Sequence, residues 1–205
     1  MANKVAQAVA EAQHPVLLLA HGTGVPVAIM ASHLTAPMGM VLSNGPMHST
    51  HSAYRMLSWC SQWPKLLALG PLRPFFWHNW MGSSVGLRRL VVNPYVMDRD
   101  TTVALLAPAI RTPPLRKQTA TFLKHLPKSV EQAPPIQAPT LLAWGDNDPL
   151  TKNVFVNSIA NKSDWISHIS IAGGQHLHPI ERPWALADIV ADFGAKIGHT
   201  HPITT

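Results

Sequence analysis

Three short polar turns in this sequence each follow an apolar run, and together they hold residue types that acid–base chemistry uses. The turns are His21-Gly22-Thr23-Gly24, then Gly145-Asp146-Asn147-Asp148-Pro149, and then Gly174-Gln175-His176. Where an acid and a histidine arrive on neighbouring strand ends, the carboxylate can orient the imidazole for general-base catalysis. The sequence therefore makes Asp148 and His176 a candidate acid and base.

The first of these turns could also be a phosphate loop or carry a nucleophile. A buried strand that turns through glycines into a helix is where several enzyme families place a phosphate loop or a nucleophile. A phosphate loop is excluded because no Gly-Lys-Ser/Thr ending is present, and a dinucleotide fingerprint lacks its third glycine. No cofactor is predicted from these motifs.

The polar residues have structural explanations as well. Asp148 in the sequence DNDP could simply cap the helix that follows it. His176 with His178 and His168 could suggest metal ligands, but a metal site needs three or four convergent donors and acids are few here, so no metal is predicted. Cys60 has no basic residue beside it, which favours a buried, inert thiol over a nucleophile.

The elements that must position these turns alternate between strand and helix. Short, continuous apolar runs predict strands that are buried on both faces of a parallel sheet. These runs are Pro15–Ala20, Met38–Ser43, Thr140–Trp144 and Ile166–Ile171, and helices are expected over residues 3–12, 25–34 and 181–197. The predicted fold class is α/β, with a half-size parallel sheet of about four strands.

Residues 47–132 interrupt this alternation with helical patterns rich in Trp, Met, Leu and Pro. They are predicted to form a helical cap or lid insertion, which leaves residues 1–46 and 133–205 as the α/β core. Six aromatic residues of the insertion are most simply the apolar lining of that cap, although they could instead form an exposed adhesive surface. They are Trp59, Trp63, Phe75, Phe76, Trp77 and Trp80.

Composition narrows the class of protein further. A chain of 205 residues that is 46% hydrophobic can bury one substantial core. The net charge is +6, but the basic residues are scattered and not interleaved with aromatics, which argues against nucleic-acid binding. A single cysteine excludes an internal disulfide, which fits a reducing compartment. The sequence also shows no evident signal peptide or transmembrane segment. A soluble, cytoplasmic protein is therefore expected.

Three stretches carry a family resemblance: LLLAHGTGVPVAIM, APTLLAWGDNDPLT and GGQHLHPIERPWALADIVADF. They resemble the nucleophile elbow, acid loop and histidine loop of the α/β-hydrolase fold, in its epoxide-hydrolase and haloalkane-dehalogenase-like branch. The resemblance runs from about residue 3 to residue 195, with the insertion in the place of the family's cap. It implies that Asp148 is the family's acid and His176 its base.

At the elbow the sequence departs from this family. The motif small-X-nucleophile-X-small reads Ala20-His21-Gly22-Thr23-Gly24 here, which puts a glycine at the nucleophile position. Thr23 could take that role only if His21 and Val25 were small residues. The elbow therefore predicts a degenerate enzyme, or pseudoenzyme.

The resemblance also implies further strands before the elbow, one of which is followed by a loop that donates an oxyanion-hole amide. This sequence shows one helix before the elbow, so a truncated sheet is expected, with a protein partner covering the edge strand Val16 to Leu19.

Three functions remain open. The chain could be a non-catalytic subunit of a larger assembly, or a hydrolase of a small apolar ester, epoxide or halide in which another chain supplies strands and His176 activates water. It could also bind an apolar small molecule under the cap.

Overall fold

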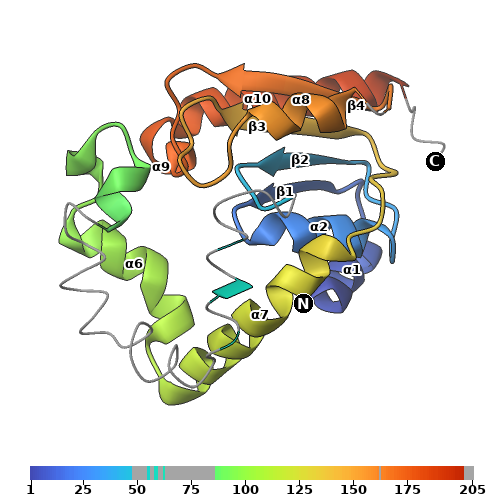
Figure 1. Cartoon of the computed structure of the whole chain (residues 1–205). Helices are drawn as coiled ribbons and strands as arrows, with labels where there is room; N and C mark the ends of the chain where they lie inside the picture. The colour runs from blue at the N-terminus through green and yellow to red at the C-terminus, as the bar shows by residue number, and fades with distance from the viewer. Residues whose placement is uncertain (48–54, 56–57, 60–61, 63–85, 162, 201–205) are drawn as a thin grey trace.

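The computed structural model describes residues 1–47, 55, 58–59, 62, 86–161 and 163–200, and its centre is a four-stranded sheet. The strands are β1 (Leu17–His21), β2 (Gly39–Ser43), β3 (Thr140–Gly145) and β4 (Ile166–Ile171). All neighbouring pairs are parallel, in the order β1-β2-β3-β4 (Figure 1). The predicted parallel sheet is confirmed, because each apolar run became a strand.

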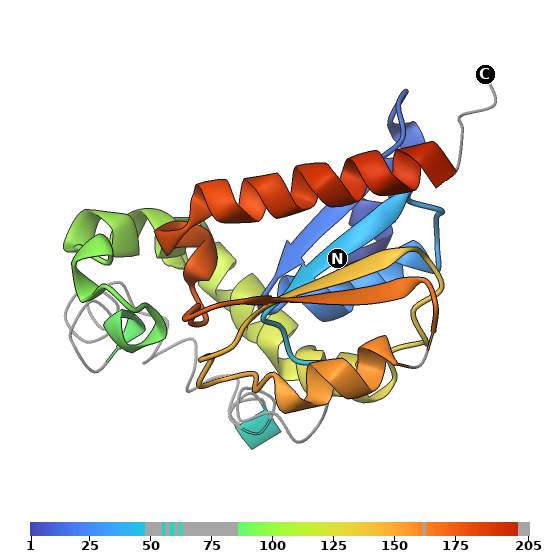
Figure 2. The same cartoon turned by 90° about the horizontal axis from the view of Figure 1, so that it is seen from above.

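Helices cover both faces of the sheet, as Figure 2 shows. On one face, α2 (Gly24–Ser32) and α8 (Val154–Ala160) pack a cluster that includes Ile29 and Val156 against Leu42 and Leu142. On the other face, α10 (Pro183–Thr200) packs Phe193 and other apolar residues against Val41 and its neighbours. Side chains of a strand alternate between the faces, so the wholly buried strand β2 contributes to both clusters.

The remaining elements lie outside the sheet. The helix α1 (Ala2–Glu11) packs on α2, and the short helix α9 (His178–Glu181) joins β4 to α10. Between β2 and β3 lie η2 (Leu87–Leu90), η3 (Pro94–Val96), α6 (Arg99–Ile110) and α7 (Pro113–Glu131). This described part of residues 47–132 is helical, in agreement with the predicted insertion, and α7 contacts both α6 and α2 (Figure 1). The division of the chain into core and cap stays a prediction.

The strand β1 lies at an edge of the sheet. The Val16 carbonyl accepts from the Met38 N–H and the Gly22 N–H donates to the Ser43 carbonyl, so the even-numbered residues between them face β2. The backbone groups of Leu17, Leu19 and His21 therefore point to the open edge. Leu19 is also 53% exposed. Among the helices that the structure describes, none is long and apolar enough to cross a lipid bilayer.

Candidate functional site

The three polar turns follow β1, β3 and β4 at their carboxyl ends, which is the edge of a parallel sheet where ligands bind. The turns after β3 and β4 pack backbone against backbone, and the Asn147 N–H donates to the Gly174 carbonyl over 3.0 Å. A Cβ on Gly145 would lie 2.6 Å from the Gly174 oxygen, so only glycine permits this approach. The close packing holds the acid turn beside the histidine turn.

Asp148 is buried in the centre of this edge, with 4% of its surface exposed. Its Oδ2 accepts hydrogen bonds from Asn44 Nδ2 (2.6 Å), His176 Nδ1 (2.9 Å) and the Thr151 hydroxyl, and its Oδ1 accepts from the Leu150 N–H (2.7 Å). Burial alone would raise the pKa of Asp148, but the hydrogen bonds, led by that from His176, lower the pKa to about 2. Asp148 is therefore an anion at neutral pH.

The contact between Asp148 and His176 is the one that the sequence predicts. Because the carboxylate can only accept, Nδ1 of His176 carries the proton and Nε2 keeps its lone pair. Asp148 does not cap the following helix, since α8 begins at Val154 and has Asn153 at its N-cap position. The carboxylate stabilises its own turn through the Leu150 N–H instead. The interpretation of Asp148 as only a helix cap is therefore wrong.

Gly22 lies opposite His176 with a left-handed backbone and no side chain. Its φ is +57°, a left-handed conformation that side chains rarely adopt. A Cβ built on Gly22 would lie 3.8 Å from Nε2 of His176. A hydroxyl one bond further out could therefore hydrogen-bond with that nitrogen, which is the relation of a serine nucleophile to its base.

Thr23, the next residue, has an ordinary backbone conformation. It is the N-cap residue of α2 with φ −67° and ψ −11°, an ordinary helical conformation, and it is exposed. The left-handed backbone therefore belongs to Gly22 and not to Thr23. That Gly22 occupies the nucleophile position of the family motif, and that Thr23 does not, stay predictions.

Asn44 is a site residue that the sequence did not single out. It follows β2 with φ 43° and is fully buried. Its Nδ2 donates to Asp148, and its Oδ1 accepts from the Gly145 N–H over 3.0 Å. Asn44 thus holds the carboxylate and the turn that carries it. In the sequence, Asn44 is marked only by the Asn-Gly pair that follows a predicted strand. Such a pair indicates a turn and gives no sign of a role in a site.

His178 and Ser43 complete the network. His178 is fully buried, and its Nε2 lies 2.8 Å from the Ser43 hydroxyl and 3.0 Å from Oδ1 of Asn44. Because that amide oxygen can only accept, Nε2 of His178 carries the proton. Nε2 therefore cannot act as a base toward Ser43, so these two residues are not a second nucleophile–base pair. Burial and then the nearby His176 lower the pKa of His178 to about 4.

His21 adds a third imidazole to this edge. Its ring centre lies 5.1 Å from that of His176 and 6.1 Å from that of His178. Its Nδ1 is 3.5 Å from the Ser43 hydroxyl, and its Nε2 is buried without a hydrogen-bond partner in the described structure. Burial and then the imidazole of His176 lower the pKa of His21 to about 3. His21 and His178 are therefore neutral at pH 7.

The other candidates of the sequence that the structure describes are not part of this network. His168 lies within β4, paired with Leu142 of β3, rather than at the carboxyl edge. No group of three potential metal ligands occurs among the residues that the structure describes. Of the aromatic residues in the insertion, Trp59 is 64% exposed. The other five, and Cys60, lie outside the described residues.

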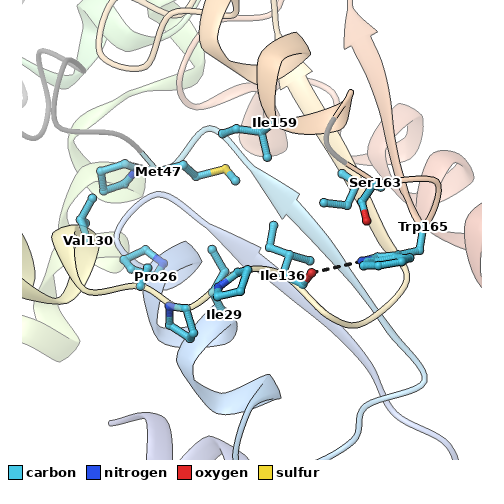
Figure 3. A pocket seen from close by; sticks show the side chains of 13 residues that line it. Pro26, Ile29, Met47, Val130, Ile136, Ile159, Ser163 and Trp165 are labelled. Atoms are coloured by element: carbon cyan, nitrogen blue, oxygen red, sulfur yellow. Dashed lines mark hydrogen bonds between the residues drawn. The ribbon is translucent and has the colours of Figure 1, made fainter.

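An apolar pocket of about 370 Å³ lies on the face of the sheet that α2 and α8 cover (Figure 3). Pro26 and Ile29 of α2 line it together with Met47, Ile136 and Trp165. The Trp165 indole N–H donates to the Ile136 carbonyl over 3.1 Å, so this donor is already used. None of the described lining residues belongs to the network around Asp148. The pocket is therefore separate from the candidate site.

Comparison with known proteins gives structural matches only. No protein-family model matches the sequence, and no curated protein matches it. A thermophilic esterase from Thermogutta terrifontis superposes with a TM-score of 0.69 at 16% identity, over 96% of this chain and 71% of the esterase. An α/β hydrolase fold protein from Burkholderia ambifaria gives 0.69 at 18% identity, over 93% and 71%. A variant of an epoxide hydrolase from Bacillus megaterium gives 0.62 at 16% identity, over 94% and 74%.

Proposed function

We propose that this chain, which has the α/β-hydrolase fold, is a non-catalytic form of that fold and works as an interaction subunit of a larger assembly. The observation that carries the proposal is Gly22. It has the left-handed backbone of the nucleophile position and faces Nε2 of His176, but it has no side chain with which to attack a substrate.

The chemistry of this fold depends on that absent group. A serine hydroxyl would give its proton to the histidine and form a covalent acyl intermediate, which water then hydrolyses. His176 has the oriented tautomer for this step, but Gly22 opposite its Nε2 has no hydroxyl for it to deprotonate. Removal of the nucleophile from such a triad costs on the order of 10⁶ in rate. We therefore expect ester hydrolysis to be slower than with an intact triad by about this factor.

The retained pair has a structural use that does not require catalysis. Asp148 is a buried anion, and its four hydrogen bonds join the turn after β3 to Asn44 and His176. A buried charge that lost these donors would be strongly destabilising. Asp148 and His176 can therefore be retained because they hold the loops at this edge together.

An assembly partner is the second part of the proposal. The strand β1 is an edge strand whose odd-numbered backbone groups point outward, and Leu19 beside them is 53% exposed. An apolar strand with an open edge pairs readily with another strand. We propose that a strand or helix of a partner protein covers this edge.

The test combines activity with assembly state. The purified chain is assayed with short acyl esters, epoxides and haloalkanes, alongside His176→Ala. Turnover that His176→Ala abolishes would overturn the non-catalytic part of the proposal. Light scattering after size exclusion, for the chain alone and after capture from its native cell extract, tests the partner. A monodisperse monomer with no captured protein would overturn the second part.

A water-activating hydrolase is the second candidate, because the lone pair of His176 Nε2 faces the space above Gly22. In that reaction a water molecule in this space would attack an ester carbonyl while its proton passes to Nε2. The tetrahedral intermediate would then expel the alcohol, which takes up that proton, and leave a carboxylic acid. Turnover without any covalent intermediate, lost in His176→Ala, would favour this candidate over the first.

A further inference from the structure

A second hollow of the molecule lies between α1, α2 and α7, and we name it the α1–α7 groove (helices in Figure 1). It has a volume of about 900 Å³ and is lined from residues 1–4, from Val27 and Met30, and from one face of α7. None of its described lining residues belongs to the network around Asp148. The α1–α7 groove is therefore independent of the candidate site and of the chemistry at Gly22.

The floor of the α1–α7 groove is apolar. Val27 and Met30 of α2 are three residues apart, and Phe122 and Leu126 of α7 are four residues apart, so each pair shares one helix face. Leu126 is buried, Val27 and Phe122 are half-buried, and Met30 is 37% exposed. Alkyl groups of a ligand could cover this floor, and each buried methylene would strengthen binding about fourfold.

The rim of the α1–α7 groove is basic. Lys4 of α1 and Lys117 of α7 line it, with His125 further along α7, and no Asp or Glu is among the described lining residues. Neither lysine has an ion-pair partner within the described part of the chain. Lysine stems can lie along apolar surface while their charges stay in water. The rim therefore offers two lysine cations beside an apolar floor.

The pocket in Figure 3 provides an internal comparison. It is also apolar, but no charged residue is among its described lining residues. The two cations are therefore a property of the α1–α7 groove rather than of every hollow on this chain. An apolar floor with a cationic rim complements one class of molecule, which has an alkyl chain and a single anionic head.

We propose that the α1–α7 groove binds an anionic amphiphile, a carboxylate on a flexible alkyl chain. The alkyl chain lies over Val27, Met30, Phe122 and Leu126, and the carboxylate lies between Lys4 and Lys117. An exposed ion pair of this kind strengthens binding about two- to fivefold for each lysine and weakens as salt is added. This inference goes beyond the proposed function, because it holds whether or not the chain hydrolyses anything.

The test uses the full chain with methyl-labelled methionine and monomeric decanoate. We expect the methyl signal of Met30 to shift on titration, while those of the buried Met40 and Met97 stay in place. Nonanoate is expected to bind about fourfold more weakly than decanoate, since it lacks one methylene. Decyltrimethylammonium, with the opposite charge on the same alkyl chain, is expected to bind more weakly than decanoate.

Charge variants decide whether the rim matters. Lys4→Glu with Lys117→Glu is expected to weaken decanoate binding about tenfold or more. The matched control is Arg111→Glu with Lys152→Glu, which makes the same charge change at exposed positions outside the described lining of the groove and should have little effect. Lys4→Gln with Lys117→Gln replaces the first pair if it fails to fold. Equal loss in the control pair, an unmoved Met30 signal, or binding only to anionic vesicles would overturn the proposal.

Discussion

A Cβ placed on Gly22 would lie 3.8 Å from Nε2 of His176, so the glycine and the histidine face each other across the space of one small side chain. The histidine is held in this orientation by Asp148, 2.9 Å from its Nδ1. Gly22 thus combines a left-handed backbone with an oriented imidazole opposite it, and it offers no side-chain atom that could attack a substrate.

Substitution of Gly22 is expected to destabilise the fold although space for a side chain is present. Because φ is +57°, Gly22→Ala should lower the free energy of unfolding by about 1–2 kcal/mol. Gly22→Ser suffers the same strain but should recover about 1 kcal/mol through a hydrogen bond to His176. Urea unfolding measures both variants.

The control for Gly22 is Gly198 in α10, where an added Cβ meets nothing within 4 Å. Gly198→Ala should stabilise the helix by up to about 1 kcal/mol. If Gly22→Ala proved as stable as the parent protein, the left-handed elbow would be refuted.

Asn44 is expected to be among the most sensitive polar positions. Its amide contacts Asp148, the Gly145 N–H and His178, so its loss leaves a buried anion and a buried N–H with fewer partners. Asn44→Gly should cost about 2–4 kcal/mol. Asn44→Ala should cost about 1 kcal/mol more, because φ is 43° and alanine adopts that conformation poorly. Asn147→Ala, at an exposed position of the next turn, serves as the control in the same urea titrations.

Much of the fold was predictable because its signals are local. Pro15–Ala20 and Thr140–Trp144 are continuous apolar runs, and a parallel sheet covered on both faces favours such strands. The pairing of Asp148 with His176 was predictable for a related reason, since both follow strands whose carboxyl ends meet at one edge.

The rest of the site depends on contacts that no local pattern encodes. Asn44 and His178 are 134 residues apart, and their hydrogen bond exists only once the sheet has formed. Spacing alone also could not exclude Asp148 as a helix cap, because that depends on where α8 begins. The structure places its first residue at Val154, with Asn153 rather than Asp148 at the N-cap position.

Acidification is expected to destabilise the fold below about pH 6.5. The pKa values of His21 and His178 are lowered to about 3 and about 4, whereas both are near 6.5 in the unfolded chain. Between these values the unfolded chain binds protons that the folded chain does not, so the free energy of unfolding falls as pH falls. Each histidine contributes a slope of up to about 1.4 kcal/mol per pH unit. The lowered pKa of His168 acts in the same direction.

Below about pH 4 Asp148 adds to this loss. Its pKa is lowered from 3.8 to about 2, so its contribution is complete above pH 3.8 and disappears as pH falls toward 2. Urea unfolding at several pH values from 7.5 to 4.5 isolates the histidines. His178→Gln should flatten the slope, because it removes one of the buried histidines with a lowered pKa. An unchanged slope in His178→Gln would show that this residue is not a buried neutral histidine.

Proline substitutions in β1 are expected to separate pairing with β2 from pairing at the open edge. The Leu18 N–H faces β2, so Leu18→Pro should remove a ladder hydrogen bond and cost about 3 kcal/mol or more. The Leu19 N–H faces outward, so Leu19→Pro should be tolerated better, as proline is on edge strands. If a partner strand covers β1, Leu19→Pro should also abolish its capture while the monomer stays folded by circular dichroism. Undiminished capture by a folded Leu19→Pro variant would show that the partner binds elsewhere.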